Sequence, residues 1–141
     1  MSRCEVLVVP GGPGTAVAAS DPDLLEWLRR PDLVTTWTTS VCTSSLILGA
    51  AGLQQGRRAT THWLSTDKLA EHGAVWEDRR VVVDRKYMSA AGVSAGIDMA
   101  LALAAELADE VVAQAIQLSL EYDLQPPFSA GSPPTAPPAI S

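Results

Sequence analysis

The sequence predicts an α/β fold, in which a mostly parallel sheet carries helices on both faces. Short β-branched apolar runs alternate along the chain with segments of helical pattern, and this order is typical of parallel sheets. The first run ends at Val9, directly before a Pro-Gly-Gly-Pro-Gly breaker, as expected for a strand buried on both faces. With 141 residues, 47% of them hydrophobic, the chain can form about one domain with a buried core.

The later elements are placed by their boundary signals. Ser20 or Asp21 can cap a helix whose first turn holds Pro22, and we expect this helix to end at Pro31. A threonine-rich strand over residues 33–40 then leads toward a helix over residues 46–51. The remaining predicted elements are a brief strand over 57–61, a capped helix over 65–73, a hairpin of 80–84 with 86–90, and helices over 97–107 and 109–122.

The end of the chain and the hairpin turn differ from this pattern. Residues 125–141 hold six of the ten prolines, which predicts an extended, mostly disordered tail after a domain over residues 1–124. Arg85 occupies the hairpin turn, where glycine would be expected.

Charge and composition argue against several classes of protein. The net charge of -6 disfavours a nucleic-acid surface, which needs clustered Lys and Arg. No run of eighteen apolar residues could span a membrane, and the start lacks the apolar stretch of a signal peptide. Two cysteines and two histidines at dissimilar spacing do not match a metal site. We therefore expect a cytoplasmic chain with reduced thiols.

Cys42 is the first candidate for chemistry. It follows a predicted strand and precedes a predicted helix, with Ser40 and Ser44 two residues to either side. A nucleophile on such an elbow needs small neighbours at those offsets because the turn is tight, and the start of the helix favours the thiolate. A small buried core cysteine fits the same pattern, so the local sequence leaves both interpretations open.

Other residues could assist such a nucleophile. Gly11 and Gly12 would let backbone N–H groups approach an anion, although an ordinary strand-to-helix turn has the same composition. His62 could be a general base or a donor, or a loop residue whose hydrogen bonds are satisfied. His72 and Asp98 fit roles at helix ends instead.

Six short motifs follow one another between residues 6 and 133. They are LVVPGG at 7–12, SVCT at 40–43, AAGL at 50–53, ATTHW at 59–63, AGVSAGID at 91–98, and EYD with PPF at 121–128. Together they resemble the ThiJ/PfpI superfamily, whose members are glutamine amidotransferase-like, and more narrowly its isonitrile hydratase branch.

The resemblance implies a flavodoxin-like three-layer sandwich and a homodimer that uses no cofactor. It also implies a small-molecule substrate, an isonitrile that gains water to become an N-substituted formamide. In that branch the Cys42 thiolate would attack the terminal carbon, and Thr43 would hydrogen-bond the reacting group. Backbone N–H groups near Gly11 and Gly12 would stabilise negative charge, with His62 in the substrate-binding region.

Three features depart from the family pattern. The family begins with a β-α-β segment, at least ~30 residues, which is missing before Val6 and which supplies the branch's acidic catalytic residue. Ser44 stands where the branch has glycine, and Arg85 lies in the hairpin turn. The departures predict slow or no turnover in the short form, and they leave open whether Met1 is the native start.

Two other functions therefore stay open. One is a non-catalytic, ligand-sensing ThiJ/PfpI domain of the kind found in transcriptional regulators. The other is a non-catalytic remnant that depends on pairing with another chain.

Overall fold

The computed structural model describes residues 3–141. Whether Met1 is the native start concerns a residue outside that range. The chain divides into two compact units, one that ends at Ala100 and one that begins at Leu101. The first unit contains two sheets and the second contains helices, which confirms the predicted α/β class with a mostly parallel sheet.

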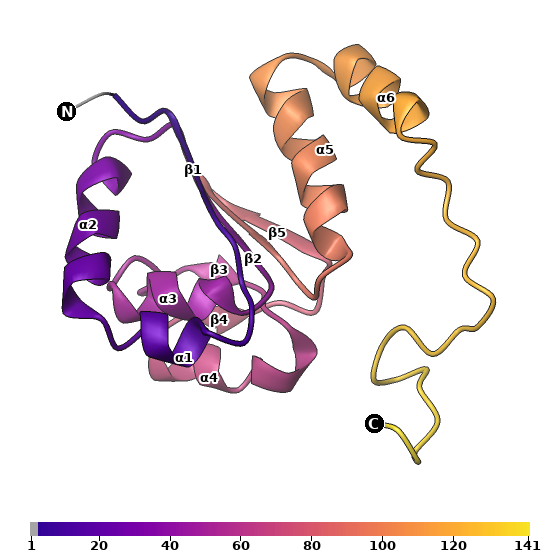
Figure 1. Cartoon of the computed structure of the whole chain (residues 1–141), viewed down its shortest axis with the longest axis horizontal. Helices are drawn as coiled ribbons and strands as arrows, with labels where there is room; N and C mark the ends of the chain where they lie inside the picture. Colours follow the sequence, from indigo (N-terminus) through magenta and orange to yellow (C-terminus); the bar gives the residue numbers. More distant parts are fainter. Residues whose placement is uncertain (1–2) are drawn as a thin grey trace. The chain divides into compact units, whose positions relative to one another are not determined.

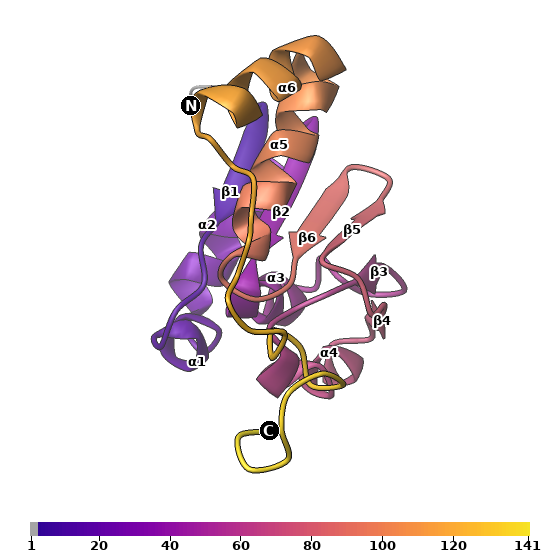
Figure 2. The ribbon, with the colours of Figure 1, turned by 90° about the vertical axis from the view of Figure 1, so that its right-hand side faces the viewer.

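The main sheet has four strands in the order β1-β2-β6-β5 (Figure 2). The strands are β1 (Val6–Val9), β2 (Trp37–Val41), β5 (Val81–Asp84) and β6 (Tyr87–Ala90). β1 and β6 both run parallel to β2, whereas β5 is antiparallel to β6. The carboxyl ends of β1, β2 and β6 therefore meet at one edge of the sheet.

Three helices lie on one side of this sheet, as Figure 1 shows: α1 (Thr15–Ala18), α2 (Pro22–Asp32) and α3 (Ser45–Ala50). Of the two capping residues that the sequence offers, Ser20 and Asp21, it is Asp21 that caps α2, because its carboxylate accepts the backbone N–H groups of the second and third helical residues. The expected end at Pro31 is wrong by one residue. A proline in the last turn removes one N–H donor but does not prevent the turn from closing.

The core of the first unit lies between β1 and these helices. Leu7 and Val9 of β1 pack with Leu28 of α2 and with Ile47 and Leu48 of α3, and all five are buried. Burial of this kind supplies most of the driving force for folding, at about 25 cal/mol per Å² of apolar surface.

A second, smaller core joins α3 to the short strands. Leu46 packs with Ala59, Leu69 and Ala74. The elements concerned are β3 (Arg58–Ala59), β4 (Val75–Trp76), a 3-10 turn (Trp63–Ser65) and α4 (Lys68–Glu71), and β3 pairs with β4 in parallel. The single helix expected over residues 65–73 is thus shorter, and it ends before Gly73, which has a φ of 74°.

The hairpin of β5 and β6 forms as predicted. Arg85 in its turn has a φ of 57°, a left-handed conformation that favours glycine. The sequence pattern had pointed to glycine at this position for that reason.

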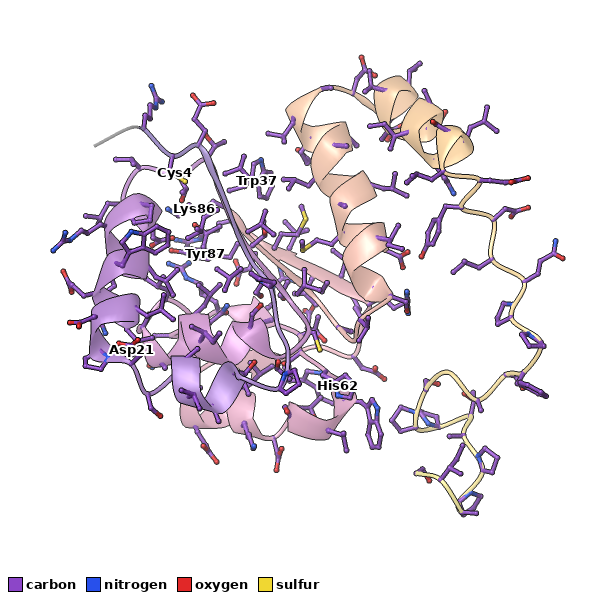
Figure 3. The ribbon with its side chains drawn as sticks, in the orientation of Figure 1. Cys4, Asp21, Trp37, His62, Lys86 and Tyr87 are labelled. Carbon is purple, nitrogen blue, oxygen red and sulfur yellow. The ribbon has the colours of Figure 1, made fainter. Side chains whose placement is uncertain are left out.

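A buried polar cluster joins the end of α2 to the starts of β2 and β6. Asp32 accepts hydrogen bonds from Thr38 Oγ1 at 2.7 Å and from the Tyr87 hydroxyl at 2.8 Å, and Lys86 Nζ lies 3.4 Å from the same carboxylate. Burial, followed by the Asp32 contact, raises the pKa of Tyr87 to about 12. In Figure 3, Lys86 and Tyr87 lie toward one end of the sheet and His62 lies toward the other.

Helix α5 (Ala95–Leu107) begins in the first unit and continues into the second, which also holds α6 (Glu110–Ser119). Asp109 caps α6 through a 2.8 Å bond from the Val112 amide. The helix expected to reach Tyr122 ends sooner, before a left-handed residue at Glu121. Residues 125–141 contain no helix or strand. Within residues 3–141, no helix has the length and hydropathy of a membrane span.

Candidate active site

Cys42 lies on a tight elbow between a strand and a helix. It opens a 3-10 turn (Cys42–Ser44) that connects the end of β2 to α3. Its φ of 60° is a left-handed conformation, which residues other than glycine rarely adopt. Such strain is found where the surrounding structure enforces it, often at functional sites. The side chain is half-buried, so it has a route to solvent.

The two serines that flank Cys42 have different surroundings. Ser44 is fully buried, and its hydroxyl accepts the Val41 amide at 2.9 Å and donates to the Val9 carbonyl at 2.5 Å. It therefore ties the elbow to the end of β1. Ser40 is also fully buried, but its hydroxyl has no hydrogen-bond partner among residues 3–141. The two hydrogen bonds of the Ser44 hydroxyl are a structural reason for a serine at position 44, where the resembled branch has glycine.

Gly11 brings the loop after β1 against the elbow. A Cβ atom at Gly11 would lie 2.8 Å from the Val41 carbonyl oxygen, 2.9 Å from the Thr43 nitrogen and 3.0 Å from Cys42 Cβ. Two of these neighbours are backbone atoms that cannot move aside. Only glycine fits at this position, because any side chain would push the loop away from Cys42.

Thr43 belongs to a closed ring of hydrogen bonds with the same loop. The Gly12 amide donates to Thr43 Oγ1 at 3.3 Å, and Thr15 Oγ1 donates to the Gly12 carbonyl at 2.9 Å. The two threonine hydroxyls are 2.6 Å apart and either can be the donor, because Thr15 Oγ1 lies 2.9 Å and Thr43 Oγ1 3.4 Å from the Gly12 carbonyl oxygen. Thr15 was not identified from the sequence, where nothing distinguishes it from other threonines.

His62 is connected to the elbow through its neighbour in sequence. The Thr61 hydroxyl donates to the Cys42 carbonyl at 2.9 Å. The His62 Nδ1 atom accepts the Leu64 amide at 3.3 Å, so the neutral ring carries its proton on Nε2. The ring lies against Gly92, where an added Cβ would be 3.3 Å from Cδ2 and 3.8 Å from Nε2.

The structure thus brings together the loop of Gly11 and Gly12 and the elbow of Cys42 and Thr43, and it links His62 to them through one hydroxyl. His72 and Asp98 contact other parts of the first unit. His72 follows α4 and packs against Gly49, whereas Asp98 pairs with Arg80 at 2.6 Å. Within residues 3–141, no three His, Cys, Asp or Glu side chains gather as metal ligands.

Comparison with known proteins shows which chains this one is similar to. The model of the DJ-1/PfpI family matches residues 1–106. The isonitrile hydratase of Pseudomonas putida is 48% identical over 136 residues, which cover 96% of this chain and 60% of that protein. The crystal structure of a THiJ/PfpI family protein from Pseudomonas syringae superposes with a TM-score of 0.93 at 48% identity, over 96% of this chain and 56% of that one.

A third relative is a transcriptional regulator. The HTH-type transcriptional regulator CdhR of Pseudomonas aeruginosa is 42% identical over 53 residues, which are 38% of this chain and 16% of the regulator. The chain therefore spans less than two thirds of the length of each of these relatives.

Proposed function

Since the chain belongs to the DJ-1/PfpI family, we propose that it is a cysteine-dependent hydratase, a lyase that adds water to an isonitrile and releases an N-substituted formamide. The observation that carries the proposal is Cys42 at a φ of 60° on the elbow between β2 and α3. The 48% identity to isonitrile hydratase supports this substrate class. The proposal includes a homodimer in the cytoplasm that works without a cofactor.

The reaction proceeds through a covalent intermediate on Cys42. The thiolate forms an S–C bond with the terminal carbon of R–N≡C, and that carbon takes up a proton to give the thioimidate S–CH=N–R. Water then adds to the same carbon and loses a proton. The C–S bond breaks, the thiolate leaves, and the nitrogen is protonated to give R–NH–CHO. One water is consumed and Cys42 is regenerated.

The loop and the elbow supply polar groups for these steps. Thr43 Oγ1 is the acceptor of a long 3.3 Å bond from the Gly12 amide, which a more negative oxygen or nitrogen could replace. The Gly12 N–H is then free to stabilise charge that develops on the reacting group. The close approach of Gly11 to the Thr43 amide keeps this N–H beside the elbow.

His62 is the first residue to test as the proton donor. Its Nε2–H is the available donor of the neutral ring, because Nδ1 accepts the Leu64 amide. General acid–base assistance of this type is typically worth about 10²–10⁴-fold in rate. We therefore expect His62→Gln to lower turnover by an amount in that range.

Hydratase activity is tested by incubating the purified chain with cyclohexyl isocyanide and measuring formamide production by chromatography. The Pseudomonas putida enzyme serves as the positive control. We expect Cys42→Ala to abolish turnover and Cys4→Ala to leave it unchanged. If the wild-type chain turns over, equal measurable turnover in the two variants would contradict the assignment of the nucleophile.

Alkylation gives a second test of the nucleophile that does not depend on the substrate. Both cysteines are half-buried, so exposure alone does not separate them. If Cys42 is the reactive thiolate, a mild alkylating agent at neutral pH labels it faster than Cys4, as mass spectrometry of peptides would show. Faster labelling of Cys4 would remove the chemical basis of the proposal.

The second candidate function is ligand sensing, which the match to the regulator CdhR favours. A sensing domain would bind a small molecule beside Cys42 without turning it over. In that case an isonitrile or formamide would raise the midpoint of thermal unfolding, while no product forms in the assay above.

A further inference from the structure

The carbonyl of Cys42 receives a hydrogen bond from Thr61, a buried residue of the loop after β3. The Thr61 hydroxyl lies 2.9 Å from this oxygen, whereas the Ser45 hydroxyl lies 3.5 Å from it, at the limit of a hydrogen bond. Thr61 is 1% exposed, so bulk water has no access to replace the bond. The bond joins residues 19 apart in the chain and ties this loop to the elbow.

The segment that carries Thr61 is itself anchored on both sides. The Thr60 amide donates to Ser89 Oγ on β6 at 2.9 Å, and both residues are buried. The next residue, His62, which Figure 3 labels, caps the 3-10 turn through its bond from the Leu64 amide. The Thr61 hydroxyl therefore has little freedom to move away from the elbow.

The acceptor belongs to the peptide group between Cys42 and Thr43. In a trans peptide the C=O and the N–H point in opposite directions, so a bond that fixes the Cys42 carbonyl also fixes the direction of the Thr43 N–H. The nitrogen of this group lies against the loop after β1, where an added Cβ at Gly11 would be 2.9 Å away. The peptide is thus held by Thr61 at its oxygen and by the Gly11 loop at its nitrogen.

This peptide directly follows the strained position of the elbow. Cys42 has a φ of 60°, which a residue other than glycine keeps only where its surroundings enforce it. If the elbow relaxed, the Cys42 carbonyl would turn away and leave the buried Thr61 hydroxyl without its acceptor, at a cost in free energy. The bond therefore favours the left-handed conformation of the candidate nucleophile.

We propose that Thr61 is a positioning residue for the reaction at Cys42. Its hydroxyl keeps the peptide oriented, so that the Thr43 N–H is available to negative charge that develops on the reacting group. A donor on the carbonyl also polarises the peptide, which makes its N–H a stronger donor. The inference rests on the proposed function and deepens it, because it adds a group that acts through the elbow and does not touch the isonitrile.

Thr39 provides a matched control for a purely structural role. It is also fully buried, and its hydroxyl donates to a backbone carbonyl, that of Leu7, at 3.1 Å. This bond lies within the sheet and does not involve the elbow. Valine at either position removes one buried hydroxyl and leaves one carbonyl without that donor. Only the change at Thr61 should reach Cys42.

Three variants test the proposal: Thr61→Val, which removes the hydroxyl, Thr61→Ser, which keeps it, and Thr39→Val. The first readout is the Thr43 amide resonance in nuclear magnetic resonance spectra, which Thr61→Val should shift. The second is the rate at which iodoacetamide alkylates Cys42, measured by mass spectrometry of peptides. We expect Thr61→Val to lower this rate about tenfold, the effect of one hydrogen bond, and the other two variants to match the wild type in both readouts.

A Thr61→Val chain that is alkylated at the wild-type rate would overturn the inference, as would an unmoved Thr43 resonance. Equal effects in Thr39→Val would reduce Thr61 to a structural role, and a Thr61→Ser variant that behaves like Thr61→Val would show that the hydroxyl is not responsible. If Thr61→Val does not fold by circular dichroism, Thr61→Ala takes its place.

The formamide assay separates this inference from the proposed function. In that assay Thr61→Val should lower kcat and leave KM unchanged, because Thr61 makes no contact with the substrate. A wild-type chain that forms no formamide would contradict the proposed function, while the resonance and the alkylation rate still decide the role of Thr61. Normal turnover in Thr61→Val would overturn this inference alone.

Discussion

Ser40 and Ser44 are both fully buried beside Cys42, and they differ in what their hydroxyl groups bind. The Ser44 hydroxyl satisfies the Val41 amide and the Val9 carbonyl, whereas the Ser40 hydroxyl has no partner within residues 3–141. A buried polar group without a hydrogen-bond partner lowers the free energy of unfolding. A buried hydroxyl that forms hydrogen bonds also satisfies the backbone groups to which it is bonded.

This difference predicts opposite outcomes for the same substitution. Ser44→Ala should lower the free energy of unfolding by about 1–3 kcal/mol, because two backbone groups lose their partner. Ser40→Ala should leave it unchanged or raise it slightly, since no hydrogen bond is lost. Urea unfolding of both variants measures the effect, and a larger loss in Ser40→Ala would contradict the hydrogen-bond assignment at the elbow.

At the scale of elements, the loop after β1 and the elbow after β2 depend on each other. The contact is made at Gly11, where a Cβ would lie 2.8 Å from one backbone atom of the elbow and 2.9 Å from another. Gly14, three residues later, has nothing within 4 Å of an added Cβ and a φ of -81°, so it provides a control in the same loop.

Gly11→Ala should therefore destabilise the chain by about 1–3 kcal/mol, which is typical of overpacking. It should also slow alkylation of Cys42, because the elbow must shift to admit the methyl group. Gly14→Ala should change neither property. The unfolding free energy and the labelling rate measure both effects, and equal behaviour of the two alanine variants would show that the loop does not press on the elbow.

The cluster of Asp32 and Tyr87 links α2 to β6, and it makes stability depend on pH in the alkaline range. The pKa of Tyr87 is raised to about 12, above its unfolded value of about 10, so the folded chain holds the proton more tightly. This contribution to stability is fully present below pH 10 and is lost as the pH rises from about 10 to about 12.

Tyr87→Phe isolates this contribution, because the other titrating groups cancel in the comparison with the wild type. At neutral pH the variant should be less stable by about 1–3 kcal/mol, since Asp32 loses a donor at 2.8 Å. The difference should shrink as the wild-type tyrosine ionises. Unfolding free energies measured between pH 8 and pH 12 test the prediction, and a constant difference would contradict it.

At the scale of the whole molecule, the proline-rich end of the chain follows the last helix. We propose that residues 1–124 form the folded domain and that residues 125–141 are an appended tail. Its side chains are largely exposed, and it contains no helix or strand. Deleting residues 125–141 should change the free energy of unfolding by less than about 0.5 kcal/mol, the usual range for exposed positions. A larger loss in a urea titration would show that the tail packs on the domain.

Much of the fold follows from local sequence signals. The strand at Val6–Val9, the cap at Asp21 and the hairpin around Arg85 were all predicted, because turn chemistry and capping act over a few residues. The elements that the sequence did not reveal, α1 and β4, have four and two residues. Such short elements carry no periodicity to recognise.

The sequence by itself determined the α/β class and the position of Cys42 between a strand and a helix, whereas only the tertiary contact with the elbow shows that position 11 needs glycine. The tertiary structure alone decided which distant side chains form hydrogen bonds with one another. The bond between Thr15 and Thr43 joins residues 28 apart in the chain, and that between Asp32 and Tyr87 joins residues 55 apart. Contacts at such separations depend on how the strands and helices stack, and one strand's pattern does not reveal which distant side chain will meet it.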